Sequence, residues 1–302
     1  MKLLALEGLE CKLARRQADR PASRREDQLK IYISSDMEGT AGVVDWSQCL
    51  PGERDFEHYR RLLQSEVNAA IDGAMLAGAD DFLVNDSHSS MQNLLPDQLH
   101  GRAGYLSGRH KPLYMMQGLD ETFDAAFFVS YHGSMGSPAS TLSHTYNPRA
   151  VAEVTVNGVV AGESGINALV AQAYGVPVAL VTGDRTTAQE VAPFCPGAET
   201  VVVKESVTRF AAASLHPEAA CELIRDGARA AINRLDSIRA PSISMPATMR
   251  VRFRNADLAE MATWLRGVER VDATAVTLTD DDPLRLYRTF VTSVALTRTV
   301  AE

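Results

Sequence analysis

Cysteine is scarce in this chain, which has 302 residues and only four cysteines. They lie far apart and include no Cys-x-x-Cys pair: Cys11, Cys49, Cys195 and Cys221. Disulfide frameworks and thiolate zinc sites usually need more closely spaced cysteines. The pattern therefore disfavours both, and it favours free thiols in a reducing compartment, so we expect a cytoplasmic protein.

Long apolar runs are absent as well. No stretch approaches the roughly 18 apolar residues of a membrane-spanning helix. The apolar stretch at the start is interrupted by Glu7 and Glu10, whereas a secretory signal needs about 7–15 apolar residues in a row. We therefore expect neither a secretory signal nor a membrane partner.

Positive charge is in deficit. The chain has 30 Lys and Arg residues against 38 Asp and Glu residues, which gives a formal net charge of -8. Nucleic acids and anionic membranes usually bind to basic surfaces, so this balance disfavours both kinds of partner. The sequence also lacks the glycine-rich phosphate-binding motifs, which disfavours a nucleotide cofactor.

The character of the sequence changes twice along the chain. Residues 1–28 are polar and crowded with arginine, and we expect a poorly ordered N-terminal extension there. Residues 29–205 alternate strand-like and helical segments, which predicts an α/β catalytic domain with a mostly parallel sheet flanked by helices. Residues 206–302 have the pattern of a smaller C-terminal α+β domain without a recognisable chemical motif.

Three segments illustrate the α/β pattern. Residues 59–77 have their apolar positions on one helical face. Residues 125–130 form an almost fully apolar run, as expected of a strand that is covered on both faces. Asn157-Gly158 lies between two short valine-rich segments, which is a strong signal for a two-residue β-hairpin.

Residues that can bind metals follow three of the predicted strands. Asp36 and Glu38 come directly after the first strand, His88 after the second and His132 after the third. Because ligands of open α/β sheets bind beyond the carboxyl ends of the strands, we expect these side chains to converge. Carboxylates and imidazoles suit zinc or manganese. Taken singly, each residue also fits a turn, a helix cap or a hydrogen-bonded structural role, and both interpretations stay open.

Three further residues have open roles. His144 lies in a polar loop and fits a general acid, a transition-state donor or a simple loop residue. Glu163 begins a predicted helix, where a carboxylate is favoured by the helix dipole, and it also fits a metal ligand. Asp184 ends another strand and fits either a helix cap or a residue that supports the site.

Five short motifs together resemble the DppA-like D-aminopeptidase family in order and approximate spacing. They are Ser35–Gly39, Val84–Ser89, Tyr131-His132, Ser143-His144 and Gly162-Glu163. The resemblance covers about residues 30–300 and is strongest before residue 185. It implies a metallopeptidase that removes the N-terminal residue, of the D-Ala type, from short peptides.

The resemblance also implies two zinc ions per subunit, with Mn2+ or Co2+ as alternatives. Asp36 would bridge the two ions, and His144 would act beside them as a catalytic residue. The family forms ring-like homo-oligomers, described as decamers, so a homo-oligomer is expected on that ground alone. The residues that match the metal ligands of the family are Asp36, Glu38, His88, His132 and Glu163.

Two other functions remain open from the residues alone. A two-metal phosphoesterase would need cationic side chains that clamp the phosphate, and the candidates are Arg102, Arg109, Lys111 and Arg149. A non-catalytic peptide-binding domain would need no metal. We expect the aminopeptidase, in which a metal-bridged hydroxide attacks the first peptide bond. His144 would then stabilise the oxyanion or donate a proton to the leaving amine.

Overall fold

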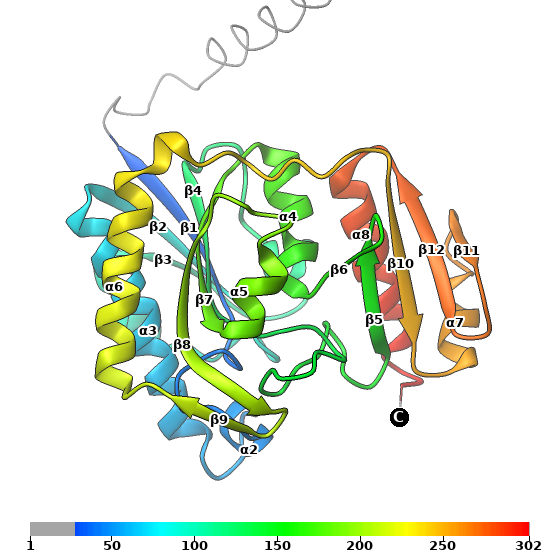
Figure 1. Ribbon diagram of the computed structural model, residues 1–302, viewed down its shortest axis with the longest axis horizontal. Coiled ribbons are helices and arrows are strands. Elements are labelled where there is room, and N and C mark those ends of the chain that lie inside the picture. Colours follow the sequence, from blue (N-terminus) through cyan, green and yellow to red (C-terminus); the bar gives the residue numbers. More distant parts are fainter. Residues whose placement is uncertain (1–27, 302) are drawn as a thin grey trace, which may run out of the picture.

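The computed structural model describes residues 28–301, which form two β-sheets with helices packed around and between them (Figure 1). The predicted extension at residues 1–28 lies outside the described residues, except for Gln28. None of the helices in the described part of the chain combines the length and apolar character needed to cross a membrane.

The larger sheet has seven strands in the order β3-β2-β1-β4-β7-β8-β9. Neighbouring strands are parallel, except that β8 and β9 are antiparallel. The order reverses between β1 and β4, and ligands of such sheets bind at the carboxyl ends of the strands at this switch point. The strands are β1 (Leu29–Ser35), β2 (Ala79–Asp86), β3 (Gly104–Leu106), β4 (Ala125–Tyr131), β7 (Val178–Asp184), β8 (Glu199–Thr208) and β9 (Ala211–Ser214).

Helices cover both faces of the larger sheet (Figure 1). α3 (Phe56–Leu76) and α6 (Pro217–Asn233) pack against each other over one face. α4 (Glu163–Tyr174) and α5 (Arg185–Val191) lie over the other. The short α2 (Trp46–Cys49) begins with a capping box formed by the residues before and within its first turn.

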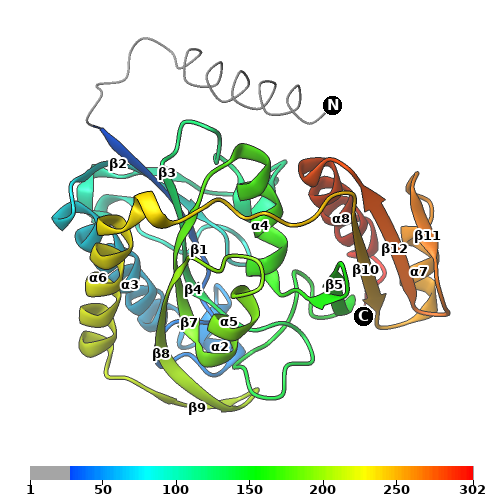
Figure 2. The same ribbon diagram turned by 45° about the horizontal axis from the view of Figure 1, so that its top comes forward.

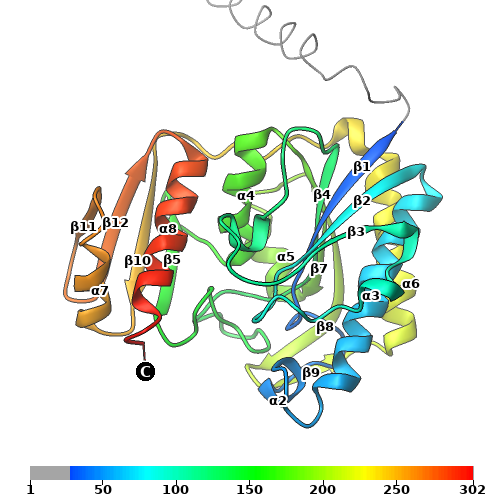
Figure 3. The same ribbon diagram turned by 180° about the vertical axis from the view of Figure 1, so that it is seen from behind.

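The smaller sheet has five antiparallel strands in the order β11-β12-β10-β5-β6. β5 and β6 form the predicted hairpin, with Asn157 and Gly158 at positive φ angles of 50° and 81°. α7 (Ala256–Ala262) and α8 (Pro283–Thr297) pack on this sheet, and α8 also contacts α4, so it lies between the two parts (Figure 2 and Figure 3). The strands are β5 (Val151–Val156), β6 (Val159–Val160), β10 (Ala247–Phe253), β11 (Val268–Arg270) and β12 (Ala275–Asp280).

Alternate side chains of the central strands enter two separate hydrophobic cores. Tyr32 and Phe128 belong to the core that continues into α4, α8 and the smaller sheet. Ile33 and Phe127 belong to the core beneath α3 and α6. Because successive strand residues point to opposite faces, a strand buried on both faces must be apolar throughout. This explains the apolar run at residues 125–130.

The predicted fold class, an α/β protein with a mostly parallel sheet flanked by helices, is confirmed. The division into domains at residue 205 stays a prediction. Elements that precede residue 205 in the sequence also pack with elements that follow it. The β5–β6 hairpin precedes residue 205 but pairs with β10 of the C-terminal part. α6 follows residue 205 but packs on α3. Pairing between distant segments therefore decides which sheet each element joins.

Candidate metal centre

The side chains predicted to bind metal gather beyond the carboxyl edge of the parallel sheet. Asp36 and Glu38 follow β1, His88 follows β2 and His132 follows β4. Glu163 is the first residue of α4 and reaches the same place from the end of the β5–β6 hairpin. All five are buried, with between 1% and 4% of their surface exposed. They form one cluster at the switch point of the sheet.

The loop after β1 is pressed against the end of β4. The backbone N–H of Asp36 donates to the carbonyl oxygen of Val129 (2.9 Å), and that of Gly39 donates to Ser130 (2.8 Å). A Cβ atom on Gly39 would lie 1.9 Å from the carbonyl oxygen of Tyr131, so only glycine fits there. The close approach fixes the loop that carries the first two carboxylates.

Lys204, on β8, holds the same loop by its backbone, a role that the sequence interpretation missed. Its ammonium donates hydrogen bonds to the carbonyl oxygens of Glu38, Thr40 (3.1 Å) and Val43 (2.7 Å). Burial lowers the pKa of Lys204 to about 8. The sequence contains a signal for this role, namely a lysine inside a valine-rich strand. A lysine in such a strand is expected to be buried, and a buried ammonium needs several hydrogen-bond acceptors.

Glu66, on α3, holds the other side of the loop and was also missed. Its two carboxylate oxygens accept hydrogen bonds from the backbone N–H of Ala41 (2.8 Å) and the hydroxyl of Ser130 (2.6 Å). Burial raises the pKa of Glu66 to about 7. Lys204 and Glu66 together fix the path of the loop without occupying the ligand atoms of the cluster.

Each histidine of the site uses one ring nitrogen to fix the orientation of its ring. A backbone carbonyl oxygen only accepts hydrogen bonds, so the nitrogen that contacts it carries the proton. In the neutral ring, the other nitrogen then has a free lone pair, as a metal ligand requires. The contacts are His88 Nε2 with Cys49 (2.8 Å), His132 Nδ1 with Gly133 (2.9 Å) and His144 Nδ1 with Leu142 (2.9 Å).

The second nitrogens of two histidines face carboxylates. Nδ1 of His88 lies 2.9 Å from Glu38 Oε2 and 3.3 Å from Asp36 Oδ1. Nε2 of His132 lies 3.4 Å from Asp36 Oδ2 and 3.5 Å from Glu163 Oε2. Asp36 therefore presents one oxygen to each of two groups of ligand atoms.

Glu163 is oriented by the backbone on the other side of the cluster. Its Oε1 accepts a hydrogen bond from the N–H of Tyr146 over 2.7 Å, while its Oε2 faces His132. Its position in the first turn of α4 also places the carboxylate in the favourable field of the helix N-terminus. Glu163 can therefore be a carboxylate stabilised by the start of α4 and, at the same time, a member of the cluster.

The carboxylates of the cluster favour the positively charged form of the histidines beside them. Within residues 28–301, the ion pairs of its three carboxylates involve only histidines. Burial raises the pKa of the Asp36 carboxyl, and the charge of Glu38 raises it further. Burial alone would lower the pKa of His88 and of His132, yet the carboxylates raise both, that of His132 to about 10. The site therefore attracts positive charge.

The ligand atoms fit divalent cations. Asp36 Oδ2, Glu38 Oε2 and His132 Nε2 are buried and form no hydrogen bond of good geometry. Glu38 Oε2 lies close to His88, and Asp36 Oδ2 lies close to His132 Nε2. Buried polar atoms are normally hydrogen-bonded, and a shared cation would satisfy them. Carboxylate and imidazole donors suit zinc. Ligand atoms also gather in groups of three that lie within 4.8 Å of one another. Two such groups are Asp36–His132–Glu163 and Glu38–His132–His144.

Cys49 lies close to the cluster, although the sequence has no Cys-x-x-Cys pair that would predict a metal-binding thiol there. Its sulfur is within 4.8 Å of ligand atoms of Glu38 and His88. Burial raises the pKa of the Cys49 thiol well above its usual value, and the charge of Glu38 raises it further. Since the thiolate is the metal-binding form, a thiol held neutral leaves the carboxylates and imidazoles as the stronger donors.

His144 lies over His132 at the entrance to the cluster. The two rings are stacked, with centroids 4.3 Å apart and planes inclined by 15°. Nε2 of His144 lies 3.6 Å from Glu163 Oε1. Burial lowers the pKa of His144, and His132 beside it lowers it further. The ring is therefore neutral near pH 7, and its Nε2 is a proton acceptor.

Two other residues singled out from the sequence have structural roles. Asp184 caps α5, accepting a hydrogen bond from the N–H of Thr187 over 2.9 Å. Lys111 is buried and donates to the side chain of Asn85 and to the carbonyl of Asp86, both over 2.6 Å. An ammonium engaged in this way is not available to clamp a phosphate.

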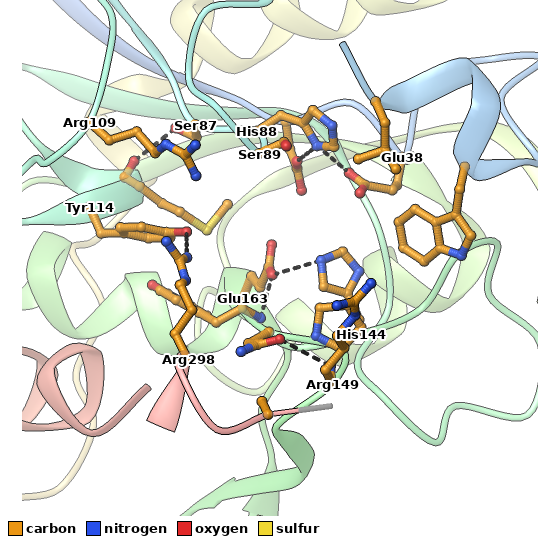
Figure 4. Close-up of a pocket in the computed structure, with 18 residues that line it drawn as sticks. Glu38, Ser87, His88, Ser89, Arg109, Tyr114, His144, Arg149, Glu163 and Arg298 are labelled. Atoms are coloured by element: carbon orange, nitrogen blue, oxygen red, sulfur yellow. Dashed lines mark hydrogen bonds and ion pairs between the residues drawn. The ribbon is translucent and has the colours of Figure 1, made fainter. Parts of the chain in front are cut away.

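A cavity of about 290 Å³ opens over the cluster (Figure 4). Three exposed arginines line it together with the buried acids: Arg109, Arg149 and Arg298. Arg298 comes directly after α8. The C-terminal part of the chain, in which the sequence showed no chemical motif, therefore contributes to the site.

Carboxylates and imidazoles gathered at the switch point of a parallel α/β sheet form a site of the kind that metal-dependent hydrolases use. Residues 29–292 match the model of peptidase family M55, described as D-aminopeptidase. The chain belongs to this D-aminopeptidase family, as the sequence motifs predicted, and it is an aminopeptidase of the metal-dependent class.

The similarity to known proteins covers nearly their whole length. A D-aminopeptidase from Bacillus subtilis (strain 168) is 34% identical over 269 residues, which cover 89% of this chain and 97% of the relative. The solved structure of the Zn-dependent D-aminopeptidase DppA from Bacillus subtilis, a self-compartmentalizing protease, matches with a TM-score of 0.85 and 33% identity. That match covers 89% of this chain and 98% of the other. The similarity extends through both sheets.

Proposed function

We propose that this protein is a zinc-dependent D-aminopeptidase that removes the N-terminal residue from short peptides and holds two metal ions per subunit. The observation that carries the proposal is the division of ligand atoms at Asp36, whose Oδ1 faces His88 while its Oδ2 faces His132. A carboxylate with this arrangement suits a bridge between two cations. The Zn-dependent solved relative supports zinc as the native metal.

Asp36, Glu38 and His88 would hold one ion, and Asp36, His132 and Glu163 would hold the other. Mn2+ or Co2+ can use the same oxygen and nitrogen donors. When bound, the metals would polarise the substrate carbonyl and lower the pKa of a water molecule. Three carboxylates offset most of the charge of two divalent ions, which suits a buried centre.

His144 is our candidate for proton transfer. Its Nδ1 donates to the carbonyl of Leu142, and its pKa is lowered by burial, so Nε2 is unprotonated at pH 7. Nε2 can take a proton from the attacking water and then return it, as an imidazolium, to the leaving amine. Oxyanion stabilisation by His144 would need a protonated ring from the start, which the lowered pKa disfavours.

The assembly and location are further parts of the proposal. The solved relative is described as self-compartmentalizing, which supports a homo-oligomer for this chain. The family resemblance supports a ring, with a decamer as the specific expectation, and the scarce, widely spaced cysteines support a cytoplasmic location. Light scattering on the purified protein tests the ring, and a mass equal to one chain of 32.8 kDa would contradict it.

The test of the activity combines metal analysis with stereoselective assays on the same sample. We expect about two equivalents of zinc per chain and release of p-nitroaniline from the D-alanyl but not the L-alanyl substrate. Chelation should abolish the release, and added zinc should restore it. p-Nitrophenyl phosphate is the control substrate for the phosphoesterase alternative.

Three outcomes would contradict the proposal. Faster cleavage of the L-alanyl substrate would overturn the stereochemical assignment. Turnover of the phosphate ester alone would favour the phosphoesterase. Protein that binds no metal and gains no activity with zinc, manganese or cobalt would favour the non-catalytic peptide-binding domain.

A further inference from the structure

The charges around the cavity are segregated. Its acidic lining residues, Asp36, Glu38 and Glu163, are at most 3% exposed and belong to the metal cluster. Its arginines are all exposed, although the chain as a whole carries a formal net charge of -8. The cavity thus has an acidic interior that suits metals and a basic entrance.

Two of the arginines lie on the same side of the cavity. In Figure 4, Arg109 and Arg298 flank Tyr114, on the side away from Glu38 and His144. Nη2 of Arg298 donates to the hydroxyl of Tyr114 over 3.0 Å. In the described part of the chain, neither arginine forms an ion pair with a carboxylate, so both guanidinium charges are available to a ligand.

Aromatic packing fixes this basic side of the cavity. The ring of Tyr114 stacks on that of Tyr146, with centroids 5.3 Å apart and planes inclined by 24°. Tyr146 also donates its backbone N–H to Glu163. The same pair of rings therefore positions Arg298 and a carboxylate of the metal cluster relative to each other.

We infer that Arg109 and Arg298 bind the C-terminal carboxylate of the peptide substrate. This inference rests on the proposed aminopeptidase function. A guanidinium pairs well with a carboxylate, in many cases through two parallel hydrogen bonds. The cavity of about 290 Å³ is at the small end of the range of roughly 300–1,000 Å³ for ligand sites. Both ends of a very short peptide can therefore contact it at once.

The consequence is selectivity for very short peptides with a free carboxyl terminus. A longer peptide would place its carboxylate outside the cavity, and an amidated peptide would leave both arginines without a partner. Arg298 lies beyond residues 29–292, the segment that matches the family model. The selectivity is therefore expected to depend on the C-terminal residues of this chain.

The test uses two substrates that differ only at the carboxyl terminus, D-alanyl-D-alanine and D-alanyl-D-alanine amide, with the metal-loaded enzyme. We expect wild-type kcat/KM to be at least about tenfold higher for the acid. Arg298→Gln and Arg109→Gln should each remove most of this preference by raising KM for the acid. The rate on the amide should fall much less than the rate on the acid. Arg288→Gln is the matched control, because Arg288 is exposed on α8 and does not line the cavity.

The outcomes separate this inference from the function on which it rests. Wild-type enzyme that cleaves acid and amide equally well would overturn the carboxylate site and leave the aminopeptidase in place. Arginine variants that slow both substrates alike, or that slow neither substrate, would also overturn the carboxylate site and leave the aminopeptidase in place. Wild-type protein that cleaves neither substrate would overturn the proposed function itself. Zinc content and circular dichroism of each variant, which should match the wild type, confirm that the fold is intact.

Discussion

The imidazole of His88 donates a hydrogen bond from Nε2 to the backbone carbonyl of Cys49 over 2.8 Å. This contact leaves Nδ1 as the free nitrogen, 2.9 Å from Glu38 Oε2. The carbonyl at the end of α2 thus selects which nitrogen of His88 faces the cluster. Partners of this kind hold ligand rings in the correct tautomer and orientation in metal sites.

Asp36→Asn should reduce the zinc content from about two equivalents to one or fewer. Both oxygens of Asp36 face histidine nitrogens, and an amide nitrogen in place of one oxygen cannot bind a metal. Activity should fall by more than the roughly 10–100-fold typical of residues that only support a ligand. Elemental analysis of the purified variant gives the measurement.

Asp184→Asn is the matched control for this prediction. Asp184 is an equally buried carboxylate, but it caps α5 rather than joining the cluster. The control should be less stable and still bind its metals. Two full equivalents of zinc in Asp36→Asn would show that Asp36 is not a ligand.

His144→Ala should lower kcat by about 10²–10⁴-fold, the range for loss of a general acid–base group, while the metal content stays unchanged. In the wild type, activity should fall at acidic pH, where Nε2 becomes protonated. Because burial lowers the pKa of His144, this fall should occur below the usual pKa of a histidine. The variant should lack this acidic limb. Loss of a metal equivalent instead would make His144 a ligand, together with Glu38 and His132.

Lys204→Met should destabilise the protein by about 3 kcal/mol, because buried carbonyl groups lose a charged donor. Zinc should also bind more weakly, since one of those carbonyls belongs to Glu38. Urea unfolding of the metal-loaded protein measures the first effect. Arg185→Gln, which removes an exposed ion pair with Glu205, should cost no more than about 1 kcal/mol. Similar losses in the two variants would argue against a special role for Lys204.

Glu66→Gln should change how stability depends on pH. The pKa of Glu66 is raised from 4.5 to about 7 by burial, so between these values the folded state binds the proton more tightly than the unfolded state. Stability from this group is therefore complete below about pH 4.5 and is lost as pH rises through 7. Glutamine resembles the protonated acid and can keep both hydrogen bonds.

The free energy of unfolding of Glu66→Gln should therefore exceed that of the wild type by about 3 kcal/mol at pH 8 and differ little near pH 4.5. Urea titrations at the two pH values, on metal-loaded samples, provide the comparison. A variant that is less stable than the wild type at pH 8 would show that the ionised carboxylate, rather than the protonated acid, is the preferred form.

Local patterns in the sequence determined much of the fold. The apolar run at residues 125–130 predicted a strand buried on both faces, and Asn157-Gly158 predicted a hairpin; both are present. These predictions succeed because side-chain periodicity and turn conformation depend on neighbouring residues. The motifs after the strands also identified the family, and the side chains they contain do meet in space. Their role as metal ligands stays a prediction.

Contacts between distant residues were decided only by the tertiary structure. The pairing of β5 with β10, the support of the metal loop by Lys204 and Glu66, and the placement of Arg298 at the cavity each join segments more than 20 residues apart. No periodicity or local spacing encodes such contacts, because they arise from packing of the whole chain. The sequence thus supplied the chemical groups of the site, and the packed fold determined which oxygen, nitrogen or guanidinium faces the cavity.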